Sequence, residues 1–478
     1  ERIKGVAPGQ LSAYIERDLI PRLHGFELLM ASYAMCHMKL DMILTQLGYK
    51  PSAQPPRLGV YLTNSLEEGE RVEQTLFGLS RAIANEAKAA SDIKRQTPIM
   101  CVIGNPPYSV SSRNKSQWIQ NLLNDYKHGL NEKKINLDDD YIKFIRFAQA
   151  LIQRNGFGII GMITNNSFLD GVTHRKMRQN LLEYFDNIFV LDLHGSSTKK
   201  EVSLDGTPDK NVFDIMQGVS VCIMVKRAHA SADMATLHHA DLLGSRESKY
   251  DSLWKMPLAN SGLKIINPVE PYYFFVPKNF DEQSTYDGFF SVQELFLENG
   301  SGVKTERDKV CVHFDQKSIK EAVEAFNAGD VDSIKTKYEL QKDSRDWTVS
   351  GAISDIRRNF DDRFYKRIFY RPFDIRYTYY TGSTRGFMGT PGRKIGRQLF
   401  ESNIGLILSR TVYGSADWQD VQVTDSIVEF GIMATRVGNT APIFPLYLYP
   451  EEGTLDQTVR VNFEPKLFAQ IRMTAGLT

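Results

Sequence analysis

Residues 101–108 read CVIGNPPY, an apolar run of strand length that leads directly into the turn Asn105-Pro106-Pro107-Tyr108. Each proline removes a backbone donor, fixes its own φ and pushes the preceding residue toward an extended conformation. The turn is therefore rigid, with an amide side chain in front of the prolines and an aromatic ring behind them. Ligands of open α/β sheets bind beyond the carboxyl ends of the strands. The stretch thus predicts a buried strand with a binding site at its end.

Strand-like and helix-like segments alternate along the first half of the chain. Apolar runs of strand length and longer stretches with helical periodicity follow one another over residues 22–28, 31–48, 57–64, 66–90, 98–104, 138–156, 157–164, 187–195 and 220–227. Such alternation is typical of an open, mostly parallel sheet with helices on both faces. After about residue 255 the helical periodicity weakens, and aromatic residues and short turns become frequent. We therefore predict an α/β domain over residues 1–285 and a mixed α+β domain over residues 286–478.

Composition limits the classes of protein to which the chain can belong. Its 478 residues include 58 Lys and Arg against 57 Asp and Glu, a net charge of +1, so a nucleic-acid surface has to come from local segregation of charge. The four cysteines are far apart with no CxxC pair, which predicts buried free thiols and no metal site: Cys36, Cys101, Cys222 and Cys311. No apolar run approaches the roughly 20 residues that span a bilayer, and the first residues lack a signal-peptide pattern. We expect a monomeric, cytoplasmic protein that does not contact membranes.

The Asn105–Tyr108 turn suits a definite chemistry. The exocyclic amine of a nucleobase is a poor nucleophile because its lone pair is delocalised into the ring. Two acceptors, the side-chain oxygen of Asn105 and the carbonyl oxygen of Pro106, would hold the amine protons and draw the nitrogen toward a tetrahedral geometry. Its lone pair can then attack a methyl donor, while Tyr108 stacks on a base that has left the duplex. The alternative is a proline-rich turn with no chemistry.

An NPPY turn after an apolar strand resembles the adenine-N6 DNA methyltransferases of the gamma order, which use S-adenosylmethionine. The resemblance implies a Rossmann-like methyltransferase sheet and assigns cofactor contacts to Phe26, Glu27, Asn64 and Asn105. Glu27 would bind the two ribose hydroxyls, as acids do in related dinucleotide sites. Asn64 stands where the family usually has an Asp against the cofactor adenine, and Phe213 matches a family aromatic that packs on the flipped base. Taken alone, Glu27 is a charge at a helix start and Phe213 a core residue.

A closer resemblance covers nearly the whole chain. Five stretches together resemble the methyltransferase and target-recognition portions of type ISP restriction–modification enzymes: HGFELLMASYAMCHMKL, DDDYIKFIRFAQALIQRNGFGIIGMITNNSFLDG, NVFDIMQGVSV, SGVKTERD and FYRPFDIRYTYY. The implied partner is double-stranded DNA with a specific site that contains a target adenine. In these enzymes a nuclease and an ATP-driven translocase precede the methyltransferase. Mg and ATP would belong to those regions only, because this chain has no GxxxxGK(S/T) phosphate loop.

The resemblance also predicts a glycine-rich motif I that cradles the methionine end of the cofactor. This motif should precede Gly25, and none of the residues before Gly25 fits it. The C-terminal sequence FAQIRMTAGLT stops where the resembling proteins continue. We therefore expect a chain that is trimmed at both ends.

Basic and aromatic residues are interleaved between Arg357 and Arg397. Such a mixture suits phosphate contacts and base stacking, and the alternative is a solvated basic face over an aromatic core. The expected DNA-binding residues are Arg371, Arg376 and Arg385 from this region, with Lys304 and Arg307 from the preceding loop, 299–307.

Two other functions are open to the sequence. Protein glutamine methyltransferases also use an NPPY turn, because a side-chain amide poses the same lone-pair problem, but they lack a large basic and aromatic C-terminal domain. Without motif I, the chain could also be a DNA-binding specificity module with an inactive methyltransferase fold. The intact Asn105–Tyr108 turn argues against decay of the pocket.

Overall fold

The computed structural model describes residues 5, 8–68, 79–108, 112–130, 132, 137–199, 201–203, 205–229, 233–255, 257, 261–409, 421–433, 441–451 and 453–476. The chain divides into two compact units, Glu1–Phe280 and Asp281–Thr478. Each unit is described by itself. The boundary predicted from sequence, between residues 285 and 286, lies close to this division.

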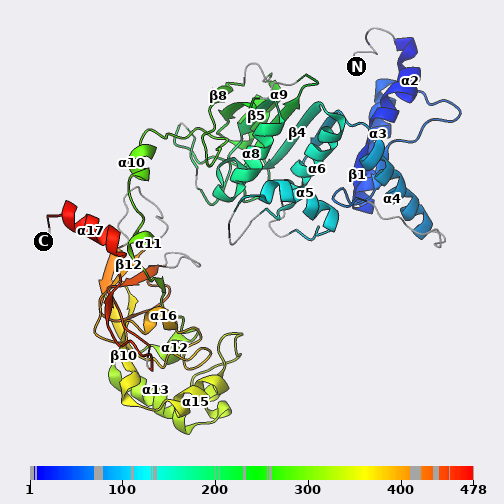
Figure 1. Cartoon of the computed structure of the whole chain (residues 1–478). Helices are drawn as coiled ribbons and strands as arrows, with labels where there is room; N and C mark the ends of the chain where they lie inside the picture. The colour runs from blue at the N-terminus through cyan, green and yellow to red at the C-terminus, as the bar shows by residue number, and fades with distance from the viewer. Residues whose placement is uncertain are drawn as a thin grey trace. The chain divides into compact units, whose positions relative to one another are not determined.

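A six-stranded sheet forms the centre of the first unit (Figure 1). Its order is β3-β4-β6-β5-β7-β8, with the bounds β3 (Cys101–Gly104), β4 (Gly158–Asn165), β5 (Asn187–Asp192), β6 (Val219–Lys226), β7 (Thr236–Asp241) and β8 (Lys264–Ile266). The pairs β3–β4 and β5–β7 are parallel, whereas β4–β6, β5–β6 and β7–β8 are antiparallel. The expectation of a mostly parallel sheet is therefore wrong. An antiparallel neighbour needs no crossover helix. Strand β6 returns between β4 and β5 through residues 193–218, whose described part consists of turns, bends, irregular backbone and one isolated bridge between Val202 and Pro208.

A separate parallel pair precedes this sheet. Strand β1 (Gly25–Glu27) pairs with β2 (Val60–Leu62), and Glu27 lies opposite Leu62. Helix α3 (Met30–Leu47) connects the two strands, and α4 (Leu79–Gln96) follows β2. Helix α3 ends at Gly48, whose φ of 94° is the left-handed conformation that glycine adopts at helix ends.

Helices cover one face of the six-stranded sheet. Alternate residues of β4, β5 and β6 point into a buried core against α5 (Gln117–Lys127), α6 (Asp140–Asn155) and α8 (Arg175–Tyr184). The opposite face carries a smaller cluster of Leu193, Val212 and Val219, against which Leu253 of α9 (Arg246–Lys255) packs. The alternating burial follows from the strand period of two. The predicted α/β fold class is confirmed.

The cysteines differ from the sequence expectation at one position. Cys222 and Cys311 are buried and Cys36 is half-buried, but Cys101 is exposed. Cys101 belongs to β3, the edge strand of the sheet, where side chains alternate between exposed and half-buried. The prediction of burial is wrong for this residue because an apolar run does not show whether its strand lies at an edge.

The second unit combines small sheets with helices, so the predicted mixed α+β class is also confirmed. Its sheets have the orders β11-β10-β14, β13-β12-β15-β9 and β16-β17. The bounds are β9 (Gly300–Ser301), β10 (Tyr365–Arg371), β11 (Asp374–Tyr379), β12 (Gly405–Leu408), β13 (Val421–Thr424), β14 (Ile427–Val428), β15 (Pro442–Pro445), β16 (Tyr447–Leu448) and β17 (Arg460–Val461). One large core joins residues of β10, β11, β12, β14 and β15 to α13 (Gln316–Ala328), α14 (Val331–Lys337) and α15 (Val349–Arg358), with Trp347 fully buried. Among the described residues of the chain, no helix is both long and apolar enough to cross a bilayer.

Candidate active site

The Asn105–Tyr108 turn lies at the carboxyl end of β3. Pro106 is buried, Asn105 and Pro107 are exposed, and Tyr108 is half-buried. The Tyr108 hydroxyl donates a hydrogen bond to Oδ1 of Asn105 over 3.1 Å. Burial raises the pKa of Tyr108 to about 12, so the hydroxyl keeps its proton and remains a donor at neutral pH. The turn is therefore closed on itself, with Tyr108 occupying the acceptor that an amine would need.

Phe213 lies beside this turn. Its ring centroid is 6.3 Å from that of Tyr108, and the two rings are inclined by 47°. Both rings pack on the apolar cluster formed by Leu193, Val212 and Val219. The structure thus brings together two aromatic residues that lie far apart in the sequence, in an arrangement that can border a flat ring.

The backbone of Phe213 is held on both sides. Its N–H donates to Oδ1 of Asn211 over 2.8 Å, and its carbonyl accepts from Arg246 over 3.1 Å. Asn211 is buried, and its Nδ2 donates to the carbonyls of Gly195 and Gln217. Sequence reasoning missed Asn211 as a support for the Phe213 backbone. The signal was present, because Asn side chains commonly accept a hydrogen bond from the backbone N–H two residues further on.

Glu27 and Phe26 lie on β1, outside the six-stranded sheet. One carboxylate oxygen of Glu27 accepts the Leu29 N–H over 2.9 Å, so Glu27 does hold the start of the following helix. Its second oxygen can accept from a ligand hydroxyl. Phe26 is half-buried and has the Nζ of Lys94 5.1 Å from its centroid. Burial lowers the pKa of Lys94 to about 8.

Asn64 follows β2 and lies next to Glu27, because Thr63 N–H donates to the Glu27 carbonyl over 2.8 Å. Both hydrogens of its amide are engaged. Nδ2 donates to Glu67 over 2.9 Å and to Asn114 over 2.8 Å, and Oδ1 accepts the Leu66 N–H over 3.0 Å. Asn64 can therefore donate to a cofactor adenine only if one of the Nδ2 bonds breaks, whereas Oδ1 can accept a second hydrogen bond.

A buried polar network links Asn64 to the segment that follows the Asn105–Tyr108 turn. Asn114 donates to Asp140 over 2.9 Å, and Ser112 donates to the same oxygen over 2.5 Å. Lys143 is fully buried, donates to Ser112 over 2.7 Å and pairs with Asp138 over 2.7 Å. The acids at 138–140 lie at the start of α6, where the helix dipole favours negative charge. Asp138 pairs with Lys143 of α6, but Asp140 accepts from Ser112 and Asn114 of another segment, so the pattern of α6 alone could not reveal the network.

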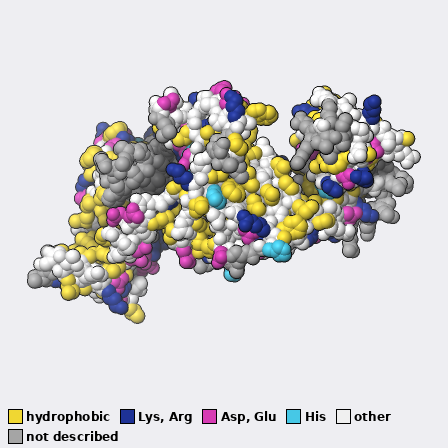
Figure 2. All heavy atoms as spheres, turned by 90° about the horizontal axis from the view of Figure 1, so that it is seen from above, with side chains coloured by type: hydrophobic (Ala, Val, Ile, Leu, Met, Phe, Trp, Pro, Cys, Tyr) yellow, Lys and Arg dark blue, Asp and Glu magenta, His cyan; other side chains and the backbone are white. Residues whose placement is uncertain are grey.

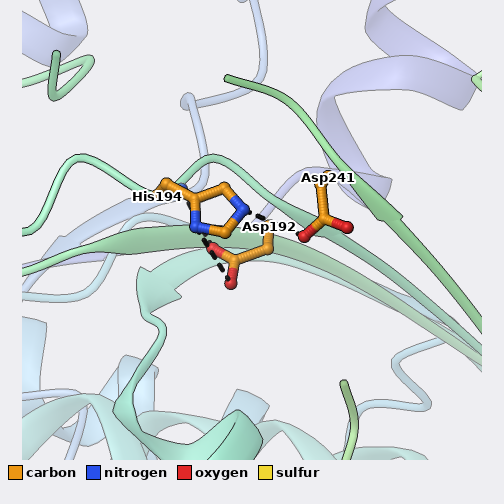
Figure 3. A group of neighbouring side chains, drawn as sticks. All are labelled: Asp192, His194 and Asp241. Atoms are coloured by element: carbon orange, nitrogen blue, oxygen red, sulfur yellow. Dashed lines mark hydrogen bonds and ion pairs between the residues drawn. The ribbon is translucent and has the colours of Figure 1, made fainter. Parts of the chain in front are cut away.

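A second cluster of charged side chains lies at the carboxyl ends of β5 and β7 (Figure 3). Asp192, His194 and Asp241 offer ligand atoms that lie within 4.8 Å of one another. Both imidazole nitrogens of His194 already face carboxylates: Nε2 lies 2.9 Å from Asp241 and Nδ1 lies 3.2 Å from Glu201. A metal ion on either nitrogen would have to replace one of these bonds. The arrangement is therefore that of a salt-bridged imidazole rather than an open set of metal ligands.

In the second unit, two of the five expected DNA-binding residues, Arg371 and Arg376, are paired with acids. Arg371 donates to Glu429 over 2.7 Å, and Arg376 lies 2.8 Å from Asp374. The guanidinium of Arg376 also lies 3.9 Å from the centroid of Phe314. Both charges are therefore compensated by acids within the fold. On the face seen in Figure 2, Lys and Arg are scattered among acidic side chains.

The other three candidates are placed differently. Lys304 is half-buried, with its Nζ 4.1 Å from the centroid of Phe430. Arg307 is half-buried and donates to the carbonyls of Glu306 and Lys342. Arg385 is exposed and has a positive φ of 56°. Of the five, Arg385 is therefore the best placed to reach a phosphate.

Comparisons with known proteins cover both units. Residues 56–198 match the family model of the Eco57I restriction-modification methylase, and residues 294–478 match that of the Type ISP C-terminal specificity domain. No curated relative matches the chain.

Three solved structures share the fold. The Type ISP restriction-modification enzyme LlaBIII bound to DNA has a TM-score of 0.69 and 23% identity over 98% of this chain and 32% of that chain. The DrdV–DNA complex has a TM-score of 0.67 and 18% identity over 98% of this chain and 46% of that chain. A nuclease-deletion mutant of the Type ISP enzyme LlaGI with a DNA substrate mimic has a TM-score of 0.65 and 19% identity over 99% of this chain and 39% of that chain. The chain thus spans less than half of the length of each of these structures. Along it, a segment similar to the Eco57I restriction-modification methylase precedes one similar to the Type ISP C-terminal specificity domain.

Proposed function

We propose that the protein is a site-specific DNA methyltransferase of a restriction–modification enzyme and that it methylates N6 of adenine. The observation that carries the proposal is the closed turn in which Asn105 and Tyr108 meet at the end of β3, with Phe213 beside them. The turn has the acceptors that an exocyclic amine needs, and the two rings can border the base.

The chemistry of the turn follows from its acceptors. An incoming adenine would displace the Tyr108 hydroxyl from Asn105 Oδ1 and donate one amine hydrogen in its place. The Pro106 carbonyl would accept the second hydrogen, and both bonds strengthen as the nitrogen becomes tetrahedral. The rigid prolines keep the two acceptors in place without offering a competing N–H. A base can reach this turn only after it has left the duplex.

The residues on β1 fit a ribose-bearing cofactor in part. Glu27 has one carboxylate oxygen engaged by Leu29 and a second oxygen for the ribose hydroxyls, and Phe26 lies next to it. Asn64 fits as an acceptor through Oδ1, but it fits as a donor only after its amide rearranges. When bound, S-adenosylmethionine would supply an electrophilic methyl group. The role of this chain is to hold the ribose through Glu27 and to orient the amine through Asn105 and Pro106.

The second unit, residues 281–478, would supply sequence recognition. Its match to a specificity domain and the DNA in three structures of the same fold support this role. One flipped adenine specifies a single base, so a longer site needs base-edge contacts made elsewhere. The proposed partner is double-stranded DNA that contains a target adenine, and we expect the protein to act as a monomer in the cytoplasm.

The test is the identity of the methylated product. The natural full-length polypeptide is incubated with duplex DNA and isotopically labelled S-adenosylmethionine, and the nucleosides are separated by mass spectrometry. We expect label in N6-methyladenine, in DNA from some sequences and not others. Label in methylcytosine would overturn the adenine assignment. In a parallel reaction with a glutamine-containing peptide in place of DNA, label in the peptide would favour a protein methyltransferase. Specific DNA binding without product would favour an inactive specificity module.

A further inference from the structure

The connection between β5 and β6 is closed at its base by His194. The Leu193 N–H donates to the Val219 carbonyl over 2.8 Å, and the Val219 N–H donates to the His194 carbonyl over 3.0 Å. His194 and Gly195 both have positive φ, 51° and 82°. A Cβ on Gly195 would lie 2.4 Å from the Cα of Asn211, so glycine is required for the close approach of these two backbone segments. The turn at His194 therefore determines where Asn211 and Phe213 lie.

His194 joins three separate parts of the first unit, two through its side chain and one through its main chain. Nε2 lies 2.9 Å from Asp241 of β7, and Nδ1 lies 3.2 Å from Glu201 of the connection. The main-chain N–H of His194 donates over 3.0 Å to Asp192 of β5, whose same oxygen accepts from Asn166 over 2.9 Å. His239 also faces this group, with Nε2 3.7 Å from Asp241. Burial would lower the pKa of His194, but the hydrogen bonds to Asp241 and Glu201 outweigh it and raise the pKa to about 10.

We propose that His194 is a positioning residue of the base pocket: its imidazole ties Glu201 to Asp241 and so holds Phe213 beside Tyr108. The proposal rests on the proposed function, because it gives Phe213 the task of bordering the flipped base. Its physical basis is charge balance. Without the imidazole, the carboxylates of Asp192, Glu201 and Asp241 converge with no cation between them, and their repulsion drives Glu201 and its segment away from β7.

The route from His194 to Phe213 is short. The carbonyl of Gly195, the next residue, accepts from Asn211 over 3.0 Å, and Asn211 accepts the Phe213 N–H over 2.8 Å. Displacement of the connection breaks the first of these bonds. Phe213 then loses its place at the pocket, while β1 and the residues proposed for the cofactor are untouched.

The experiment compares His194→Asn with the matched control His238→Asn in the natural full-length polypeptide. His238 lies on β7, three residues before Asp241, but its ring stacks on Phe189 of β5 with centroids 4.6 Å apart, on the other side of the strand from Asp241. We expect His194→Asn to lower kcat by about tenfold or more, the size of a lost base–aromatic contact, with the Kd for S-adenosylmethionine unchanged. With 2-aminopurine at the target position of the duplex, His194→Asn should give a smaller rise in fluorescence on binding than the control does. Adding Glu201→Gln should restore part of the lost kcat, because it removes one uncompensated carboxylate.

Hydrogen exchange separates this proposal from the proposed function. In His194→Asn, the amides of residues 211–218 should exchange faster than in the control, whether or not the protein methylates adenine. Unchanged exchange and unchanged kcat in His194→Asn would overturn the proposal even if the wild-type protein makes N6-methyladenine. Tight one-to-one binding of Zn²⁺ that His194→Asn abolishes would also overturn it, because the ring would then be a metal ligand.

Discussion

The hydroxyl of Tyr108 caps the side-chain oxygen of Asn105 across 3.1 Å, inside the turn to which both residues belong. The acceptor proposed for the substrate amine is thus satisfied in the structure without substrate. Water would hydrogen-bond an exposed amide oxygen almost as well, so this internal bond adds little net free energy, but it keeps the Tyr108 ring at the pocket. Entry of a base therefore exchanges one hydrogen bond for another, and the net cost is small.

Asn105→Ala should abolish methyl transfer and leave specific DNA binding nearly intact. Of the DNA, the Asn105 side chain would contact only the target amine, whereas affinity for DNA would come mostly from phosphate contacts and from the second unit. A methyl-transfer assay beside a binding titration on the same duplex checks this. Turnover at the wild-type rate in the variant would contradict the assigned chemistry.

Tyr108→Phe should retain methyl transfer, because the ring can still stack on the base and the Asn105 oxygen is freed from its internal donor. Tyr108→Ala removes the ring and should cost about 1–3 kcal/mol in transition-state binding, the range of a base–aromatic contact. Steady-state kcat/KM of Tyr108→Phe and Tyr108→Ala, each relative to the wild-type protein, tests this difference. If Phe is as damaging as Ala, the hydroxyl itself takes part in the reaction.

Glu27→Gln should weaken S-adenosylmethionine binding. The change keeps the shape of the side chain but removes the charge from bonds that are worth on the order of 1.5–3 kcal/mol each. Asn64→Ala is the matched control at the neighbouring strand end, since the Asn64 amide is already used by Leu66, Glu67 and Asn114. Calorimetric titration should show a larger rise in Kd for Glu27→Gln than for Asn64→Ala. The reverse order would mean that Glu27 serves the helix start alone.

Some of these features could be predicted from sequence and others could not, for a physical reason. The turn after β3 is local: an apolar run, an amide, two prolines and a ring define it without any distant partner. The saturation of Asn64 by Asn114 depends on a contact across 50 residues, and the pairing of Arg371 with Glu429 on one across 58. Composition shows that Arg371 is basic but not that an acid neutralises it. The antiparallel direction of β6 could not be predicted either, because the pattern of apolar residues in a strand does not show its direction.

The stability of the first unit should depend on the ionisation of Asp139. Burial, together with the neighbouring Asp138 and Asp140, raises the pKa of Asp139 to about 6. The folded protein thus holds a proton that the unfolded chain loses near pH 4, so the free energy of unfolding falls as pH rises between about 4 and 6.

Asp139→Asn removes this dependence. We expect it to stabilise the protein by about 1 kcal/mol near pH 8, a value reduced for the partial exposure of the group, and to have no effect near pH 4. Asp138→Asn is the contrasting variant, because it leaves the fully buried Lys143 without its carboxylate and should destabilise. Thermal unfolding at both pH values measures the difference. A loss of stability in Asp139→Asn near pH 8 would contradict the raised pKa.

The arginines of the second unit should divide into a DNA contact and a structural pair. Arg385 is exposed, so Arg385→Gln should weaken DNA binding for all sequences alike and lower the slope of log K against log salt by about 1, with Tm unchanged.

Arg376→Gln should instead change the stability of the fold and not the binding of DNA. Its guanidinium is paired with Asp374 and lies between the rings of Phe314 and Tyr370, so its loss should lower Tm and leave the salt slope as it is. Binding titrations over a salt series, on a cognate and a scrambled duplex, distinguish the two. If Arg376→Gln flattens the salt dependence, the pair with Asp374 opens on DNA and the arginine contacts phosphate after all. If Arg385→Gln instead loses discrimination at one base pair, by about 1–3 kcal/mol, this residue reads a base edge.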